Sequence, residues 1–252
     1  MKETPLDVLA FAAHPDDAEI GCGGTLATLA QRGYRVGIAD LTLGELASRG
    51  TPEQRQLEAQ EAAVVLGLAV RENLRLPDGG LRAAPDQLKV VVECLRRLRP
   101  ELVLAPHAAA RHPDHRGAAA LVEHACFLSG LYRYQPELPP HQPRRVLFYA
   151  ERYSIRPVFV VDVSPLYDRK LKALSCYRSQ LYNPDAAGAP PTLIGAPETL
   201  AVLEARDRGC GALAGVSFAE GFTLRESLTI DDPVAFFRSA LPAHAFPARE
   251  QD

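Results

Sequence analysis

The chain has 252 residues, of which 47% are hydrophobic and 23% are charged, a composition typical of one globular domain that buries its own core. The formal net charge of −3 argues against the basic surface by which proteins bind nucleic acids or anionic membranes. The five cysteines are scattered and form no C-x-x-C pair, and neither a secretory signal nor an apolar stretch of membrane-spanning length is visible. We therefore expect a cytoplasmic protein without nucleic-acid or membrane partners.

In the first half of the chain, short aliphatic runs alternate with longer amphipathic segments. The runs predict strands at residues 7–13, 35–41, 73–76 and 102–105. The amphipathic segments predict helices at residues 23–32, between Thr51 and Gly67, at 86–98 and at 114–128. This alternation predicts a Rossmann-like, doubly wound α/β fold, with a mainly parallel sheet and helices on both faces in three α/β/α layers.

The second half of the chain is less regular. We expect further strands at residues 146–150 and 158–163, and helices starting at Ser164-Pro165 and covering 198–210. We interpret the Pro-rich segment 136–143 and the Pro/Gly/Ala-rich segment 183–197 as loops. No internal repeat or domain boundary is visible, so we expect a single domain over residues 1–252 that is less regular from about residue 183.

Two polar clusters follow predicted strands. His14-Pro15-Asp16-Asp17 comes after the first strand, and Arg111-His112-Pro113-Asp114-His115 comes shortly after the fourth. Because ligand sites in open α/β sheets lie beyond the carboxyl ends of the strands, both clusters should face the same crevice. Imidazole and carboxylate groups ligate divalent metals, and a catalytic zinc site typically takes three protein ligands.

His14 and Asp17 are the first two candidate ligands, because a proline-containing turn lets side chains at this spacing converge. The third ligand is His112 or His115, and the spacing alone leaves both open. Asp16 then remains as a general base for a water activated by the metal. The two clusters together therefore predict a hydrolase.

Simpler interpretations exist for parts of this pattern. A single His-Pro-Asp-Asp run is more often a capped helix start, and only the second cluster favours a metal site. The glycines of Gly21-Cys22-Gly23-Gly24 suggest a dinucleotide site, but they begin well after the strand, and Leu26 stands where that fingerprint needs its third glycine. We interpret these glycines as allowing the amino terminus of the helix to approach the metal loop.

The motif Ala13 to Gly21 followed by Gly23-Gly24-Thr25-Leu26, together with residues 111–115, resembles the PIG-L/LmbE-like family of zinc-dependent N-acetylglucosamine deacetylases. The resemblance extends over about residues 6 to 225. Further segments look like the subgroup that deacetylates N-acetylglucosaminyl L-malate in bacillithiol biosynthesis; they are residues 41–45, 48–51, 55–58, 76–81, 177–180 and 218–222.

The resemblance implies a carbohydrate N-deacetylase in which His14, Asp17 and His115 bind Zn²⁺ and Asp16 is the general base. It implies that His112 stabilises the developing oxyanion or protonates the leaving amine, with Asp114 as its orienting partner. Because nitrogen and oxygen donors also accept Fe²⁺, Co²⁺ or another divalent metal, the sequence leaves the metal open.

The resemblance also implies substrate contacts, from Arg55, Glu45, Arg49 and Asp78, with the two arginines as candidates for the malate carboxylates. The partner is then a small sugar conjugate, and relatives suggest a homo-oligomer, a trimer or hexamer. Two alternatives remain open. The substrate is another N-acetylated sugar such as a chitobiose-like compound, or the chain is a non-catalytic metal-binding module.

Overall fold

The computed structural model describes residues 4–135, 137–151, 155–184 and 189–240. The strands are β1 (Val8–Ala12), β2 (Val36–Asp40), β3 (Val70–Asn73), β4 (Leu102–Pro106), β5 (Arg145–Tyr149), β6 (Phe159–Asp162) and β7 (Ala219–Thr223). The α-helices are α1 (Asp17–Gln31), α2 (Pro52–Leu66), α3 (Pro85–Leu98), α4 (Pro113–Ser129), α5 (Tyr167–Ser175), α6 (Thr199–Ala212) and α7 (Pro233–Ala240), and a short 3-10 turn, η1 (Ser164–Leu166), precedes α5. None of the helices in these ranges is long and apolar enough to cross a membrane.

The strands form one mixed sheet in the order β3-β2-β1-β4-β5-β7-β6. The pairs β3–β2, β2–β1, β1–β4 and β4–β5 are parallel, whereas β7 is antiparallel to both β5 and β6. The chain runs outward from β1 to β3 and then returns to place β4 on the other side of β1. The switch point of the doubly wound fold, where ligand sites form, therefore lies between β1 and β4.

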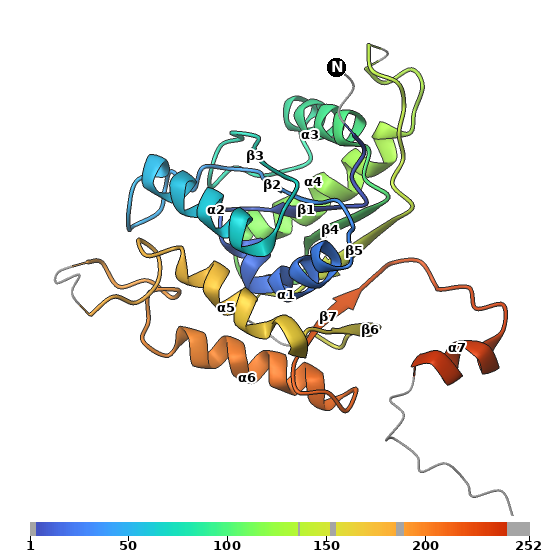
Figure 1. Cartoon of the computed structure of the whole chain (residues 1–252). Coiled ribbons are helices and arrows are strands. Elements are labelled where there is room, and N and C mark those ends of the chain that lie inside the picture. Colours follow the sequence, from blue (N-terminus) through green and yellow to red (C-terminus); the bar gives the residue numbers. More distant parts are fainter. Residues whose placement is uncertain (1–3, 136, 152–154, 185–188, 241–252) are drawn as a thin grey trace, which may run out of the picture.

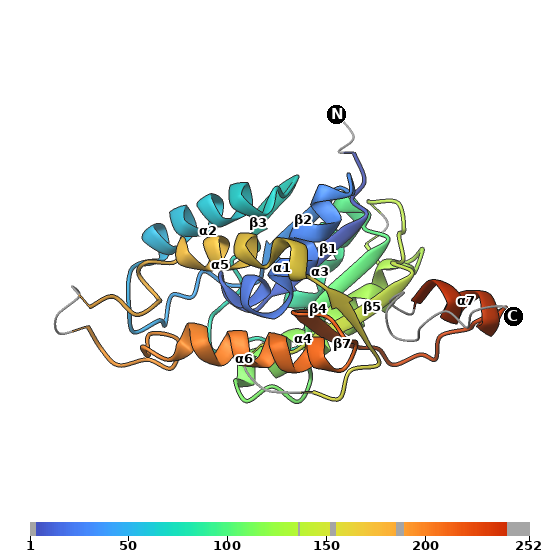
Figure 2. The same ribbon diagram turned by 60° about the horizontal axis from the view of Figure 1, so that its bottom comes forward.

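Helices cover both faces of the sheet (Figures 1 and 2). Leu9 and Phe11 of β1 face one way, into a core shared with α3 and α4. Val8 and Ala10 face the other way, into a core shared with α1, α2 and α5. All five residues of β1 are buried, as expected for a central strand covered on both sides. The predicted three-layer α/β/α architecture is confirmed.

Several local signals were interpreted correctly. Thr51 caps α2 by accepting a hydrogen bond from the Gln54 amide, and Gly67 ends the helix in the left-handed region at φ 78°. The predicted apolar face of α3 is buried, including Val91 and Leu95. The predicted loop at 183–197 contains neither helix nor strand in its described residues, 183–184 and 189–197.

Two expectations about the elements were wrong. Helix α1 begins at Asp17, directly after the first cluster, and not at residue 23. Strand β3 covers Val70–Asn73, earlier than the predicted 73–76. Strand β7 and helix α7 lie after residue 210, where the sequence pattern is mixed and we made no prediction of individual elements. The long-range antiparallel pairs that define β7 leave little trace in local periodicity.

The interpretation of the glycines after the first cluster was also wrong. They lie inside α1, and the structure shows what they approach. A Cβ on Gly21 would lie 2.1 Å from the Tyr149 ring, and one on Gly24 would lie 2.8 Å from Val163. Gly21 and Gly24 therefore let β5 and the segment after β6 pack directly against α1, and they do not serve an approach to the metal loop.

Candidate active site

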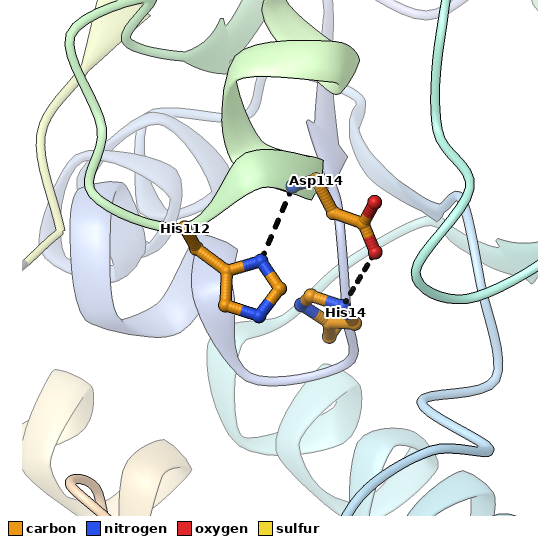
Figure 3. A group of neighbouring side chains, drawn as sticks. All are labelled: His14, His112 and Asp114. Atoms are coloured by element: carbon orange, nitrogen blue, oxygen red, sulfur yellow. Dashed lines mark hydrogen bonds and ion pairs between the residues drawn. The ribbon is translucent and has the colours of Figure 1, made fainter.

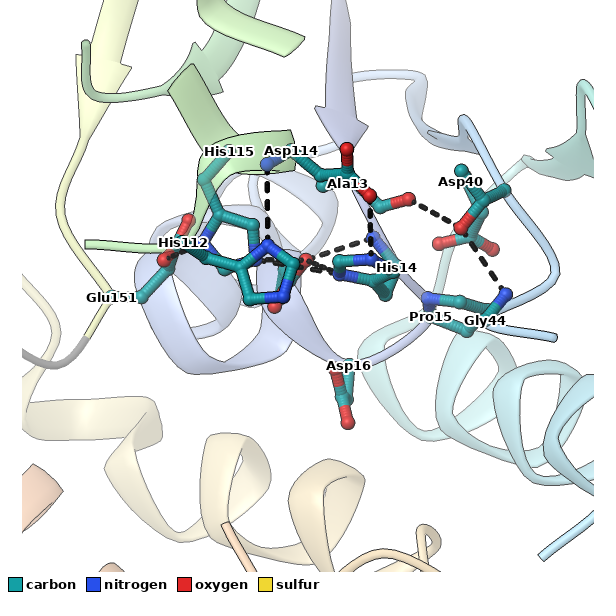
Figure 4. A network of polar contacts seen from close by, with 12 residues as sticks. Ala13, His14, Pro15, Asp16, Asp40, Gly44, His112, Asp114, His115 and Glu151 are labelled. Atoms are coloured by element: carbon teal, nitrogen blue, oxygen red, sulfur yellow. Dashed lines mark hydrogen bonds and ion pairs between the residues drawn. The ribbon is translucent and has the colours of Figure 1, made fainter. Parts of the chain in front are cut away.

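The two polar clusters meet at the switch point of the sheet. His14 and Asp17 stand between the end of β1 and the first turn of α1, and His115 lies in the first turn of α4, after β4. The Asp17 Oδ2 atom lies 3.2 Å from His14 Nδ1 and 3.2 Å from His115 Nε2. These two imidazole nitrogens, of His14 and His115, are 3.4 Å apart (Figure 4). One carboxylate oxygen and two ring nitrogens thus point at a common centre.

In each of these imidazoles, the ring nitrogen that does not face the common centre contacts a carboxylate. His14 Nε2 lies 3.0 Å from Asp78 Oδ1 and 3.5 Å from Asp114 Oδ2, and His115 Nδ1 contacts Glu151 Oε2. A carboxylate in this position fixes the ring orientation and makes a metal-ligating imidazole more basic. The donor set and its support therefore fit a divalent cation with nitrogen and oxygen ligands.

The cluster is electrostatically unusual. Burial by itself would raise the pKa of Asp17, but the two imidazoles hold it well below its usual range. Burial would lower the pKa of His115, but Asp17 and Glu151 raise it to about 10. Burial also opposes charge on His14, yet the three carboxylates around it raise its pKa well above the ordinary value. Without a cation, the imidazoles of His14 and His115 are therefore protonated at neutral pH, and their positive charges balance the surrounding carboxylates.

Asp16 lies beside the group of His14, Asp17 and His115, but its side chain bonds to Arg55. Its backbone is in the left-handed region with φ 119°, a conformation that non-glycine residues rarely adopt and that is often found at functional sites. Burial raises the pKa of Asp16 to about 7, against the opposing charge of Arg55, whose Nη2 donates to Asp16 Oδ2 at 2.8 Å. A carboxyl group with this pKa can exchange a proton at neutral pH.

His112 takes a place distinct from that of His115. It caps α4, because its Nδ1 accepts a hydrogen bond of 3.2 Å from the Asp114 amide (Figure 3). Burial and the neighbouring imidazole charges lower the pKa of His112, so the ring is neutral at neutral pH and its proton is on Nε2. The ring stacks on His115 with centroids 4.8 Å apart. His112 therefore presents an N–H donor beside the His14, Asp17 and His115 group.

Two carboxylates hold the loops around this group. Asp114 accepts hydrogen bonds from the amides of Gly79 at 2.6 Å and Leu81 at 3.1 Å, in addition to its contact with His14. Asp78 accepts from the Leu46 amide, and its own amide donates to Glu45. The side chain of Glu45 thus supports the Asp78 loop.

A cavity of about 520 Å³, here called the main cavity, opens over this site. Asp16, Arg55 and Asp78 line it, whereas Arg49 lines a neighbouring depression and donates to the Gln180 carbonyl oxygen. The substrate contacts predicted for Arg55, Glu45, Arg49 and Asp78 stay predictions. The outer wall of the main cavity includes three residues of the 183–197 loop, Thr192, Leu193 and Ile194.

Sequence reasoning missed Glu151. This carboxylate is buried, lines the main cavity and contacts His115 Nδ1. Glu151 lies two residues after the end of β5. It therefore lies at the carboxyl end of a strand, where ligand sites form in this fold, as His14 does. The rule was applied only to β1 and β4, because the sequence does not reveal that β5 is the parallel neighbour of β4.

Comparisons with known proteins identify the family of this chain. Residues 9–126 match the family described as PIG-L, GlcNAc-PI de-N-acetylase. Over 188 residues the chain is 32% identical to the diacetylchitobiose deacetylase of Thermococcus kodakarensis, covering 69% of each protein. The chain belongs to the PIG-L family. The predicted resemblance is thereby confirmed at the level of the family.

Other relatives indicate how varied this PIG-L group is. A protein of Bacillus cereus named "Probable N-acetyl-alpha-D-glucosaminyl L-malate deacetylase 2" is 27% identical over 188 residues, 69% of this chain and 83% of the relative. The 4-oxalmesaconate hydratase of Pseudomonas putida is also 27% identical, over 68% of this chain and 73% of its own. The crystal structure of the conserved protein TT1542 from Thermus thermophilus superposes with a TM-score of 0.81 at 40% identity, over 90% of this chain and 98% of that chain.

Proposed function

We propose that this protein is a divalent-metal-dependent N-deacetylase of an N-acetylglucosamine conjugate. The observation that carries the proposal is the group of His14, Asp17 and His115, with carboxylates behind both imidazoles and Asp16 beside it. A divalent cation held by these three side chains would supply Lewis-acid polarisation of the acetamide carbonyl and a more acidic attacking water.

The chain's own residues would then move the protons. Asp16 takes the proton of the attacking water, a role that suits a carboxyl group whose pKa burial raises to about 7. His112 Nε2 donates a hydrogen bond to the carbonyl oxygen as negative charge develops there. Asp16 next gives its proton to the departing nitrogen, so that acetate and a free glucosamine amine are the products. Arg55 keeps the carboxylate of Asp16 oriented throughout.

For the conjugate itself we infer N-acetylglucosaminyl L-malate, which would give glucosaminyl malate and place the enzyme in bacillithiol biosynthesis. The Bacillus cereus relative and the six similar sequence segments support this choice. Arg111, exposed on the wall of the main cavity, is well placed for a malate carboxylate, whereas Arg55 already donates to Asp16 and to the Pro15 carbonyl. The higher identity to the diacetylchitobiose deacetylase makes a chitobiose-like compound the second candidate.

Substitution of the general base tests the mechanism. Asp16→Asn should retain the metal but lose turnover by about 100-fold to 10,000-fold, because only proton transfer is removed. Asp86→Asn, an exposed position in the first turn of α3, is the matched control. Acetate release and metal content are measured for both. Full turnover of metal-loaded Asp16→Asn would contradict the mechanism, and absence of acetate release by the wild type with every conjugate would favour a hydratase or a non-catalytic metal-binding module.

Substrate preference is tested by comparing kcat/KM for N-acetylglucosaminyl malate, N,N′-diacetylchitobiose and free N-acetylglucosamine. We expect the malate conjugate to be preferred, and Arg111→Met to raise KM for that compound alone, because only malate carries carboxylates. A preference for the other sugars would overturn the bacillithiol assignment but leave the deacetylase intact. Activity restored by Zn²⁺, Fe²⁺ or Co²⁺ after chelation identifies the metal, for which we propose Zn²⁺. We further propose a cytoplasmic homo-oligomer, a trimer or hexamer, which sedimentation velocity tests.

A further inference from the structure

Helix α1 is interrupted one turn after the candidate ligand Asp17. At Cys22 the backbone leaves the helical region, with φ −144° and ψ 17°. In a continuous helix the amide of Gly24 would donate to the carbonyl of Ile20. Here the Gly24 amide donates to Glu220 Oε1 at 2.9 Å, and the next amide, that of Thr25, donates to Glu220 Oε2 at 2.7 Å. Glu220 of β7 thus caps the second half of α1 from a distant part of the chain.

The Ile20 carbonyl, which loses its helical partner at the interruption, accepts a hydrogen bond from Arg206 of α6. Its Nη2 donates to the Ile20 carbonyl at 2.7 Å, and its Nη1 donates to the Ala150 carbonyl at 3.0 Å. Ala150 directly precedes Glu151, whose carboxylate supports His115. One guanidinium group therefore joins the segment that carries a candidate metal ligand to the segment that orients another.

Arg206 is itself held in a buried ionic network with three other side chains. Its Nε and Nη2 donate to Asp207 Oδ1 at 2.9 and 2.7 Å. Lys170 Nζ lies 2.7 Å from Asp207 Oδ2 and 2.6 Å from Glu220 Oε1, which closes the connection back to the helix cap. Two cations and two anions balance, and Lys170, Asp207 and Glu220 are almost fully buried. A satisfied polar network in a low-dielectric interior permits only a narrow range of geometries.

Arg206 does not line the main cavity. The main cavity is lined by Ile20 and Glu151, to whose segments Arg206 is bonded, whereas Arg206 itself borders a much smaller cavity behind them. Metal ligands must be held within a few tenths of an ångström of their ideal positions, and the groups that orient them affect metal affinity by about 10-fold to 100-fold. A change at Arg206 can therefore reach the metal site without touching the substrate.

We propose that Arg206 is a positioning residue for the metal site: by bonding the carbonyls of Ile20 and Ala150 it fixes Asp17 and the Glu151–His115 pair relative to each other. The inference rests on the proposed metal site. It also gives a role to Glu220, which belongs to the segment 218–222 that the proposed catalytic steps leave without a function.

The test uses the full chain with Co²⁺ as the probe, because its visible absorption reports ligand geometry independently of turnover. Arg206→Met should weaken Co²⁺ affinity by about 10-fold to 100-fold and alter the absorption bands. Arg206→Lys should recover part of the affinity, because an ammonium group still donates to a carbonyl. At saturating metal, kcat should fall with KM unchanged. Arg208→Met, on the same helix but exposed and paired with Glu204, should match the wild type.

Unchanged Co²⁺ affinity and absorption in a folded Arg206→Met protein would overturn the proposal, whatever the loss in thermal stability. If that variant does not fold, Arg206→Lys decides by the same criterion: weakened affinity supports positioning, and wild-type affinity overturns it. A wild type that binds no Co²⁺ would refute the proposed metal site itself. If the wild type binds Co²⁺ and releases acetate, and Arg206→Met has the same Co²⁺ affinity and absorption, only the role of Arg206 is refuted.

Discussion

The ion pair between Arg55 and Asp16 sets the pH at which the proposed general base is ionised. Arg55 Nη2 lies 2.8 Å from Asp16 Oδ2, and both side chains are buried. Burial raises the pKa of Asp16 to about 7, and the charge of Arg55 is the strongest influence in the opposite direction. Arg55→Met removes this charge while keeping an unbranched side chain to fill the space.

The expected magnitude follows from the short distance. An opposite charge within about 4–6 Å lowers a carboxyl pKa by about 1–3 units, so its loss should raise the pKa of Asp16 by a similar amount. The base works only when ionised, so activity is lost as the pH falls through this pKa. A higher pKa moves the acidic limb of the profile to higher pH. At neutral pH, kcat/KM should therefore fall by about 10-fold to 1,000-fold, and it should recover in alkaline buffer.

The assay is acetate release measured across the pH range for wild type and Arg55→Met. The matched control is Arg178→Met, because Arg178 is exposed and pairs with Glu61 outside the main cavity. Metal content is measured in parallel and should be unchanged, since neither Arg55 nor Asp16 is a candidate ligand. A loss of activity that is equal at every pH, with the acidic limb unmoved, would refute the reasoning.

Three further predictions concern the same site and its support. His112→Gln should lower kcat by about 100-fold to 1,000-fold with metal affinity unchanged in titrations, and loss of the metal instead would assign His112 as a ligand. Zn²⁺ binding at neutral pH should release protons, because neighbouring carboxylates raise the pKa of His115 to about 10; calorimetry in buffers of different ionisation enthalpy should detect this, and a buffer-independent enthalpy would contradict it. Gly21→Ala should destabilise the fold by about 1–3 kcal/mol in thermal unfolding, because its Cβ meets the buried Tyr149 ring. Gly209→Ala, in α6 with nothing within 4 Å, should stabilise by up to about 1 kcal/mol, and equal effects of the two glycine variants would contradict this account.

The central part of the site could be predicted because it depends on local patterns and one topological rule. The strands before His14 and before the 111–115 cluster are continuous apolar runs, which mark them as buried parallel strands. In a doubly wound sheet the first such strand and the first one after the reversal are neighbours, so their carboxyl ends meet. Residue spacing left His112 and His115 as equal candidates, and only the side-chain positions separate their contacts.

The residues that hold the candidate ligands in place could not be predicted, because their role depends on contacts between segments that are distant in the sequence. Glu151 becomes significant only once β5 is known to pair with β4. The true start of α1 was hidden by glycines, which have low helix propensity, and by the interruption at Cys22. That interruption is tolerated because Glu220 and Arg206 satisfy the backbone groups it leaves, and both come from the least regular part of the sequence.

The two halves of the chain contribute different parts of the site. The candidate ligands and the proposed general base come from the end of β1 and from the first turns of α1 and α4, in the first half of the chain. The second half supplies Glu151, which orients a ligand, and Leu193 and Ile194, which form part of the wall of the main cavity. We therefore expect substitutions after β5 to change metal affinity or substrate preference while the candidate ligands stay the same. For substrate preference, the wall around Leu193 is the place where such substitutions should act.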